Sequence, residues 1–209
     1  MTIDRCPEPV NFKELFRDRP GEEYPQKRSY KGKTIFLVDK FPVKNKETLK
    51  FSIESVNSRY PQGFAIHIFS GYLSINGESM EYDKEANVLF WEDSEMLDTK
   101  DINVQVFSKK GHVFITNIWE ETIYEENKSG YFKDVDGSVT YNKIFRYPEG
   151  KKVTCHVGAG RCAYTNHTCS NAMYSEDIPN GKRYHCNDGI PDDDFDDIVF
   201  TVTRLQTDG

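Results

Sequence analysis

The sequence predicts an all-β fold, a β-sandwich or jelly roll with a short, mostly irregular N-terminal arm. Short apolar runs and alternations with the two-residue period of half-buried strands recur from residue 31 onward, separated by turn residues. Helical periodicity is almost absent, and aromatic residues, which favour strands, make up 13% of the chain. Many short strands joined by turns are typical of sandwiches and jelly rolls.

Length and composition restrict the class of protein. A chain of 209 residues can bury a core without a metal or a disulfide. The net charge of −7 argues against a nucleic-acid partner, and no apolar run has the length of a transmembrane helix. The first thirty residues are too acidic for a secretory signal, so the protein either stays inside the cell or is a mature form.

Two parts of the chain differ in character. Residues 1–30 are polar and interrupted by four prolines, and we expect an arm with one short helix that begins after Asn11. Residues 31–209 show no repeat or linker, and we expect a single sandwich domain. Its expected strands are residues 35–38, 49–53, 64–69, 72–75, 88–91, 102–107, 113–119, 139–145, 153–157 and 198–205.

Turn signals predict how some of these strands connect. Asn76-Gly77 is the strongest hairpin signal in the chain, because both residues tolerate positive φ. The turn at 109–111 predicts a hairpin between the strands at 102–107 and 113–119. The polar stretch 120–137 is expected to be a long loop.

The most distinctive stretch is an acidic run directly before the last strand. Six carboxylates fall between Asp188 and Asp197, and the β-branched and aromatic residues 198–202 follow at once. Neighbouring carboxylates repel by about 1 kcal/mol or more per pair, unless water or a cation screens them. Calcium takes six to eight oxygen ligands and prefers carboxylates. The run is therefore either a calcium loop or a fully solvated acidic turn.

The acidic run also resembles a known motif. The segment Asp192-Asp-Asp194-Phe195-Asp196-Asp197, with Asp188 before it and an apolar strand after it, is similar to the acidic loop of the bacterial calcium-mediated, fucose-binding type lectins. This resemblance covers about fifteen of the 209 residues, and Asp196 stands where the family has Asn. It implies that calcium binds sugar hydroxyls directly and that the chain forms homo-oligomers. It also implies these calcium ligands: Asp188, Asp192, Asp194, Asp196 and Asp197.

Four of the five cysteines lie close together in the sequence, and three histidines lie among them. The four are Cys155, Cys162, Cys169 and Cys186. One or two disulfides would indicate an oxidising compartment and a secreted or surface protein. A structural Zn²⁺ site is the second possibility, although the spacings lack the close pairs typical of zinc sites, and inert buried thiols are the third. If the chain is instead a full precursor without a signal peptide, we expect it in the cytoplasm.

Other candidate residues have simpler explanations. The four glutamates at 120, 121, 125 and 126 could supply the paired carboxylates of a glycosidase, but a solvated loop face explains them better. Trp91 and Trp119 end strands beside acids and could form a sugar platform, but burial in the core is favoured.

The leading functional hypothesis is calcium-dependent binding of a carbohydrate or similar polyol. The alternative is a structural or assembly domain in which the metal only fastens the final strand. A glycan hydrolase that uses loop carboxylates is a further alternative. The sequence favours a binding protein over an enzyme.

Overall fold

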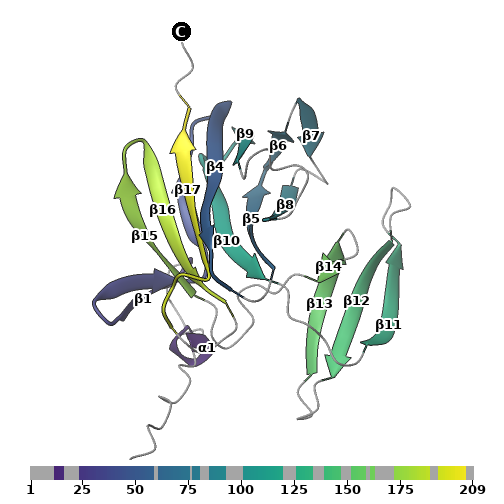
Figure 1. Cartoon of the computed structure of the whole chain (residues 1–209). Helices are drawn as coiled ribbons and strands as arrows, with labels where there is room; N and C mark the ends of the chain where they lie inside the picture. Colours follow the sequence, from purple (N-terminus) through teal and green to yellow (C-terminus); the bar gives the residue numbers. More distant parts are fainter. Residues whose placement is uncertain are drawn as a thin grey trace, which may run out of the picture.

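The computed structural model describes residues 12–16, 24–58, 61–75, 77–80, 85–92, 101–119, 126–133, 139–146, 152–158, 161–162, 172–188 and 193–205. These residues form strands and one short helix, which confirms the all-β prediction (Figure 1). The helix and the first strands are α1 (Phe12–Leu15), β1 (Lys27–Tyr30), β2 (Lys33–Phe36), β3 (Asp39–Pro42), β4 (Glu47–Val56), β5 (Gln62–Phe69), β6 (Gly71–Ile75), β7 (Glu78–Met80) and β8 (Glu85–Trp91). The later strands are β9 (Asp101–Ser108), β10 (His112–Trp119), β11 (Glu126–Lys133), β12 (Val139–Arg146), β13 (Lys152–Gly158), β14 (Arg161–Cys162), β15 (Ala172–Ile178), β16 (Gly181–Asn187) and β17 (Ile198–Arg204).

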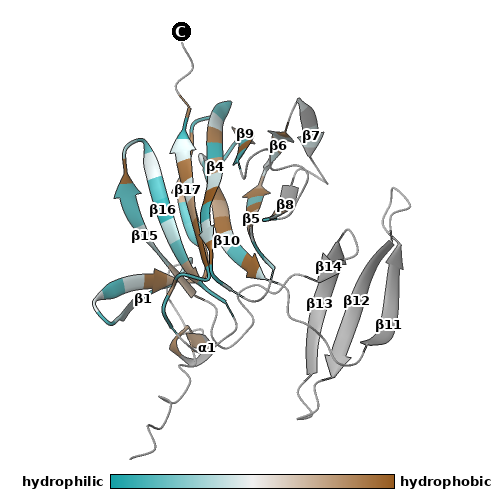
Figure 2. Cartoon of the chain, in the orientation of Figure 1, coloured by the Kyte–Doolittle hydropathy of each residue, from teal (hydrophilic) through white to brown (hydrophobic). Residues whose placement is uncertain are grey.

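Two antiparallel sheets pack face to face as a sandwich. The larger has nine strands in the order β1-β2-β15-β16-β17-β4-β9-β6-β7, and the smaller has four in the order β3-β10-β5-β8. Hydrophobic and hydrophilic residues alternate along β4, as the two-residue period requires (Figure 2). One side of each sheet therefore faces the core and the other faces outward.

Stacked phenylalanines fill the centre of the sandwich. The ring of Phe64 on β5 lies 5.0 Å from that of Phe51 on β4 and 5.0 Å from that of Phe200 on β17. It also lies 5.1 Å from the ring of Phe90 on β8. All four side chains are fully buried, so this stack joins the two sheets at the middle of the core.

The expected final strand lies at the centre of the larger sheet. β17 pairs with β16 on one side and with β4 on the other. Every residue from Ile198 to Val202 is buried, which explains why the apolar run is continuous rather than alternating. The acidic run therefore leads directly into a central strand.

The predicted hairpin between the strands at 102–107 and 113–119 is wrong. β9 belongs to the nine-stranded sheet, where it pairs with β4 and β6, whereas β10 lies in the small sheet between β3 and β5. Residues 109–111 therefore cross from one sheet to the other, and the hydroxyl of Ser108 donates a hydrogen bond to the carbonyl of His112 at 3.1 Å. Alternation identified the core-facing residues of both strands, but it carries no information about which sheet each strand joins.

Other connections agree in part with the turn signals. β6 and β7 form the hairpin expected at Asn76-Gly77, and Gly77 has a φ of 84°. β15 and β16 form a second hairpin, which the sequence did not predict, and Asn180 in its turn has a φ of 61°. The expected loop over residues 120–137 is wrong for 126–133, because β11 pairs there with β12. A third sheet, in the order β11-β12-β13-β14, contains the two strands expected around 139–157.

The expected short helix is present and packs against the large sheet. Phe12 and Phe16 are buried in a small cluster with Ile35, Ala172 and Phe195. The ring of Phe195, which belongs to the acidic run, lies 5.8 Å from the ring of Phe12. Within the described residues, no helix has the length and apolar character needed to cross a membrane.

Candidate functional site: the acidic loop

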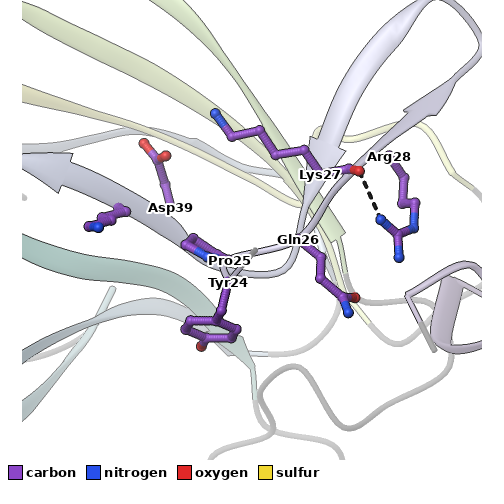
Figure 3. Close-up of a pocket in the computed structure, with 7 residues that line it drawn as sticks. Tyr24, Pro25, Gln26, Lys27, Arg28 and Asp39 are labelled. Carbon is purple, nitrogen blue, oxygen red and sulfur yellow. Dashed lines mark hydrogen bonds between the residues drawn. The ribbon is translucent and has the colours of Figure 1, made fainter. Parts of the chain in front are cut away.

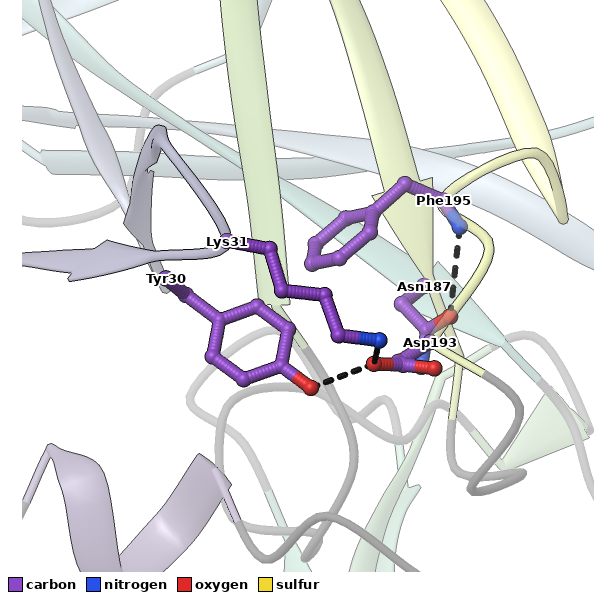
Figure 4. A network of polar contacts seen from close by, with 5 residues as sticks. All are labelled: Tyr30, Lys31, Asn187, Asp193 and Phe195. Carbon is purple, nitrogen blue, oxygen red and sulfur yellow. Dashed lines mark hydrogen bonds and ion pairs between the residues drawn. The ribbon is translucent and has the colours of Figure 1, made fainter. Parts of the chain in front are cut away.

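The acidic loop connects β16 to β17, and one aromatic residue anchors it. Phe195 is 2% exposed, and its ring packs against those of Phe12 and Tyr174. Its backbone N–H donates to Oδ1 of Asn187, the last residue of β16, at 3.5 Å (Figure 4). Both Asp193 and Phe195 have positive φ values, 51° and 62°, so the chain turns tightly on either side of Asp194. Asp192, an expected ligand, lies outside the described residues.

Two of the expected ligands face inward. Asp188 is fully buried, and its Oδ2 accepts hydrogen bonds from Ser58 Oγ at 2.6 Å and from Gln62 Nε2 at 3.0 Å. The backbone N–H of Asp188 donates to Oδ2 of Asp197 at 2.7 Å, and Asp197 is 4% exposed. These contacts connect the loop to the end of β4 and the start of β5. In this structure, both carboxylates therefore bind protein donors and hold the loop in place.

The other two expected ligands among the described residues face outward. Asp194 and Asp196 are exposed, and the backbone N–H of Asp196 donates to Oδ1 of Asp194 at 3.2 Å. Partial burial and the neighbouring Asp194 carboxylate raise the pKa of Asp196, while a hydrogen bond from the Asn57 side chain opposes the rise. Two carboxylates thus lie together at the surface and repel each other when both are ionised. A cation between them would relieve that repulsion.

Asp193 has a different role, which the sequence did not indicate. Its Oδ2 accepts hydrogen bonds from the Tyr30 hydroxyl and from Lys31 Nζ, the latter at 2.7 Å (Figure 4). Burial opposes ionisation of Asp193, but the bonds from Lys31 and Tyr30 outweigh it and lower its pKa. This ion pair joins the loop to the β1–β2 turn, which consists of Lys31 and Gly32.

The described residues fit calcium by ligand type but supply few ligands in one place. Carboxylate and amide oxygens are suitable for a hard cation, and Asp194, Asp196 and Asn57 provide both. Within the described ranges, no group of three or more histidine, cysteine or acidic side chains could hold a metal ion. The outward pair alone would therefore supply only a weak, open site.

The cysteine cluster is described only in part. Cys186 is a free thiol, fully buried in the main core, and burial followed by the charge of Asp197 raises its pKa. Its position on the inward side of β16 explains why it packs with apolar residues rather than in a disulfide. Cys155 and Cys162 lie on the neighbouring strands β13 and β14, but their side chains and all of Cys169 fall outside the described residues. Their pairing, or binding of zinc, stays a prediction.

Both tryptophans are buried, which confirms the expectation that they lie in the core. Trp91 is 8% exposed and Trp119 is 2% exposed, so neither offers a free ring face to a sugar. Of the acids proposed for a hydrolase, Glu126 begins β11 and the others lie outside the described residues.

Comparison with known proteins returns no matching family model, no matching curated protein and no matching solved structure.

Proposed function

We propose that this chain is a calcium-dependent carbohydrate-binding module whose ion binds at the outward pair of Asp194 and Asp196. The supporting observation is the position of these two carboxylates. They lie side by side on the exposed part of the loop, and Asp194 contributes to the raised pKa of Asp196. Calcium bound there would supply open coordination positions for a pair of vicinal sugar hydroxyls.

The three other described acids of the loop prepare the site rather than bind the ion. Asp188 and Asp197 connect the loop to the β4–β5 region, and Asp193 connects it to the β1–β2 turn. Phe195, which is buried against Phe12 and Tyr174, fixes the backbone on which the outward pair stands. With the geometry held in advance, binding costs less ordering of the loop. Because only two described carboxylates meet, we expect weak calcium binding, with a Kd of about 10⁻⁴–10⁻³ M.

The contacts that hold the loop favour a binding module over a structural domain in which the metal only fastens the final strand. The loop is held at both ends by hydrogen bonds and an ion pair that need no metal. A cation that only fastened the final strand would duplicate them. An ion on the exposed side is instead placed where a ligand from solvent can reach it.

A glycan array of neutral sugars, run with calcium and again with chelator, tests the proposed function. We expect sugar binding that appears only with calcium and is lost in Asp194→Asn, because that change removes a charged ligand and keeps the side-chain shape. Asp177→Asn is the matched control, because Asp177 is an exposed acid of β15 outside the loop. Binding that persists in chelator, or that survives Asp194→Asn, would refute calcium-dependent recognition at this pair.

A further inference from the structure

A group of aromatic rings lies on the outer face of the small sheet. His112 and Phe114 of β10 point away from the core, since the residues between and beyond them, Val113 and Ile115, are buried. The rings of His112 and Phe69 lie 5.1 Å and 5.4 Å from that of Phe114. His67 is directly opposite Phe114 in the sheet register, and its ring lies 4.1 Å from that of Phe69. None of these residues is fully buried, so they form a half-exposed aromatic surface.

Tyr24 extends this surface into a cleft. Its ring lies 5.9 Å from that of Phe114, and its side chain is 60% exposed. Its phenol is neutral at neutral pH and can donate a hydrogen bond, and partial burial raises its pKa further. The cleft has a volume of about 520 Å³, within the range of small-ligand sites (Figure 3). It is lined by residues 24–28 together with Asp39 and Lys40.

Two lysines of the cleft, Lys27 and Lys40, could meet a ligand, and Lys27 Nζ also lies 5.9 Å from the centre of the Phe36 ring. Asp39 is buried, and its Oδ2 accepts hydrogen bonds from Lys182 Nζ at 2.7 Å and from the Tyr184 hydroxyl at 2.8 Å. Within the described residues, neither Lys27 nor Lys40 forms an ion pair with a carboxylate. Lys40 is exposed and is directly opposite Phe114 in the register, which places its charge beside the rings.

A third lysine lies at the other side of the rings. Lys110 Nζ is 5.8 Å from the centre of the Phe69 ring. The chain as a whole carries a net charge of −7. The lysines around the aromatic surface are therefore a local group of positive charges in a chain that is negative overall. Cations beside apolar rings match a ligand that has both an anionic group and an apolar face.

We propose that this cleft and the adjoining aromatic surface bind an acidic oligosaccharide without a metal ion. A pyranose ring packs its C–H face on Tyr24, and its carboxylate or sulfate group lies between Lys27 and Lys40. The rings of Phe114 and Phe69 continue the apolar contact to a second sugar. The site does not use the acidic loop, so this inference is independent of the calcium site.

Calorimetric titration of chelator-treated protein with three sugars of equal length tests the proposal. We expect oligogalacturonate or a sulfated heparin fragment to bind at least tenfold more tightly than a neutral malto-oligosaccharide. The two acidic sugars distinguish carboxylate from sulfate recognition. Binding should weaken as salt is raised, because the lysines are exposed. Equal binding of the neutral sugar, or no binding of either acidic sugar, would overturn the proposal.

Variants locate the binding. Tyr24→Ala and Lys40→Gln should each weaken the acidic sugar about tenfold, which corresponds to about 1.4 kcal/mol. Lys44→Gln, which removes an exposed lysine that is not part of the cleft, should leave affinity unchanged. Asp194→Asn should also bind the acidic sugar normally, so that failure of the calcium site and failure of this site give different results. Tighter binding of adenosine monophosphate than of either acidic sugar would refute recognition of a sugar.

Discussion

Replacing Phe64 by Ala is expected to lower the free energy of unfolding by about 3–5 kcal/mol, the usual cost of removing a buried aromatic side chain. Phe64 is fully buried, and its ring stacks on three others that come from both sheets. The substitution removes that shared contact and leaves a cavity that the neighbouring strands cannot fill, because their hydrogen-bond register fixes their spacing. Urea denaturation followed by circular dichroism measures the change.

Tyr24→Ala serves as the control for this measurement. It removes an aromatic ring of similar size, but one that is 60% exposed, so we expect a change within about 1 kcal/mol. If Phe64→Ala cost no more than Tyr24→Ala, the stacked rings would not form the core that joins the sheets.

Asp188→Ala should destabilise the fold by about 2–4 kcal/mol, because Ser58 and Gln62 lose a buried, charged acceptor. Asp188→Asn keeps one side-chain oxygen as an acceptor and should cost about half as much. Thermal or urea unfolding with excess calcium and again with chelator gives the comparison. If Asp188 anchors the loop, Asp188→Ala should lower the free energy of unfolding by the same amount with calcium and with chelator.

A calcium-dependent effect of the substitution would change the role assigned to Asp188. If Asp188→Ala were destabilising only when calcium is present, the residue would be a metal ligand, as the resemblance to the calcium-mediated lectins implies. Ser58→Ala, which removes one donor to the same carboxylate, should cost less than Asp188→Ala and should also be independent of calcium.

The sequence predicted the strands that have a clear alternation or a continuous apolar run. β4 and β17 agree with the prediction because burial alone determines which of their residues are apolar. The hairpin of β15 and β16 was missed because its exposed end carries charged residues such as Glu176 and Arg183, which hide the strand pattern. Partner choice was also beyond the sequence, since β9 and β10 both alternate and yet join different sheets.

For the acidic loop, the sequence showed which residues are acidic but not which carboxylates face inward and which face outward. Phe195 has a positive φ and is buried, and this decides which carboxylates turn inward. A bulky residue in that conformation is rare, so a pattern of alternating acids gives no warning of it. The ion pair between Lys31 and Asp193 joins positions 162 residues apart, and only the folded chain brings them together.

Calorimetric titration of calcium into the intact chain tests most directly whether the outward acids bind the ion while the inward acids hold the loop. We expect a Kd of about 10⁻⁴–10⁻³ M for the unaltered protein. Asp194→Asn and Asp196→Asn should each weaken binding at least tenfold, while Asp177→Asn should have no effect. No calcium binding to the unaltered protein, or full binding in both loop variants, would contradict the proposal that the outward acids bind the ion and the inward acids hold the loop.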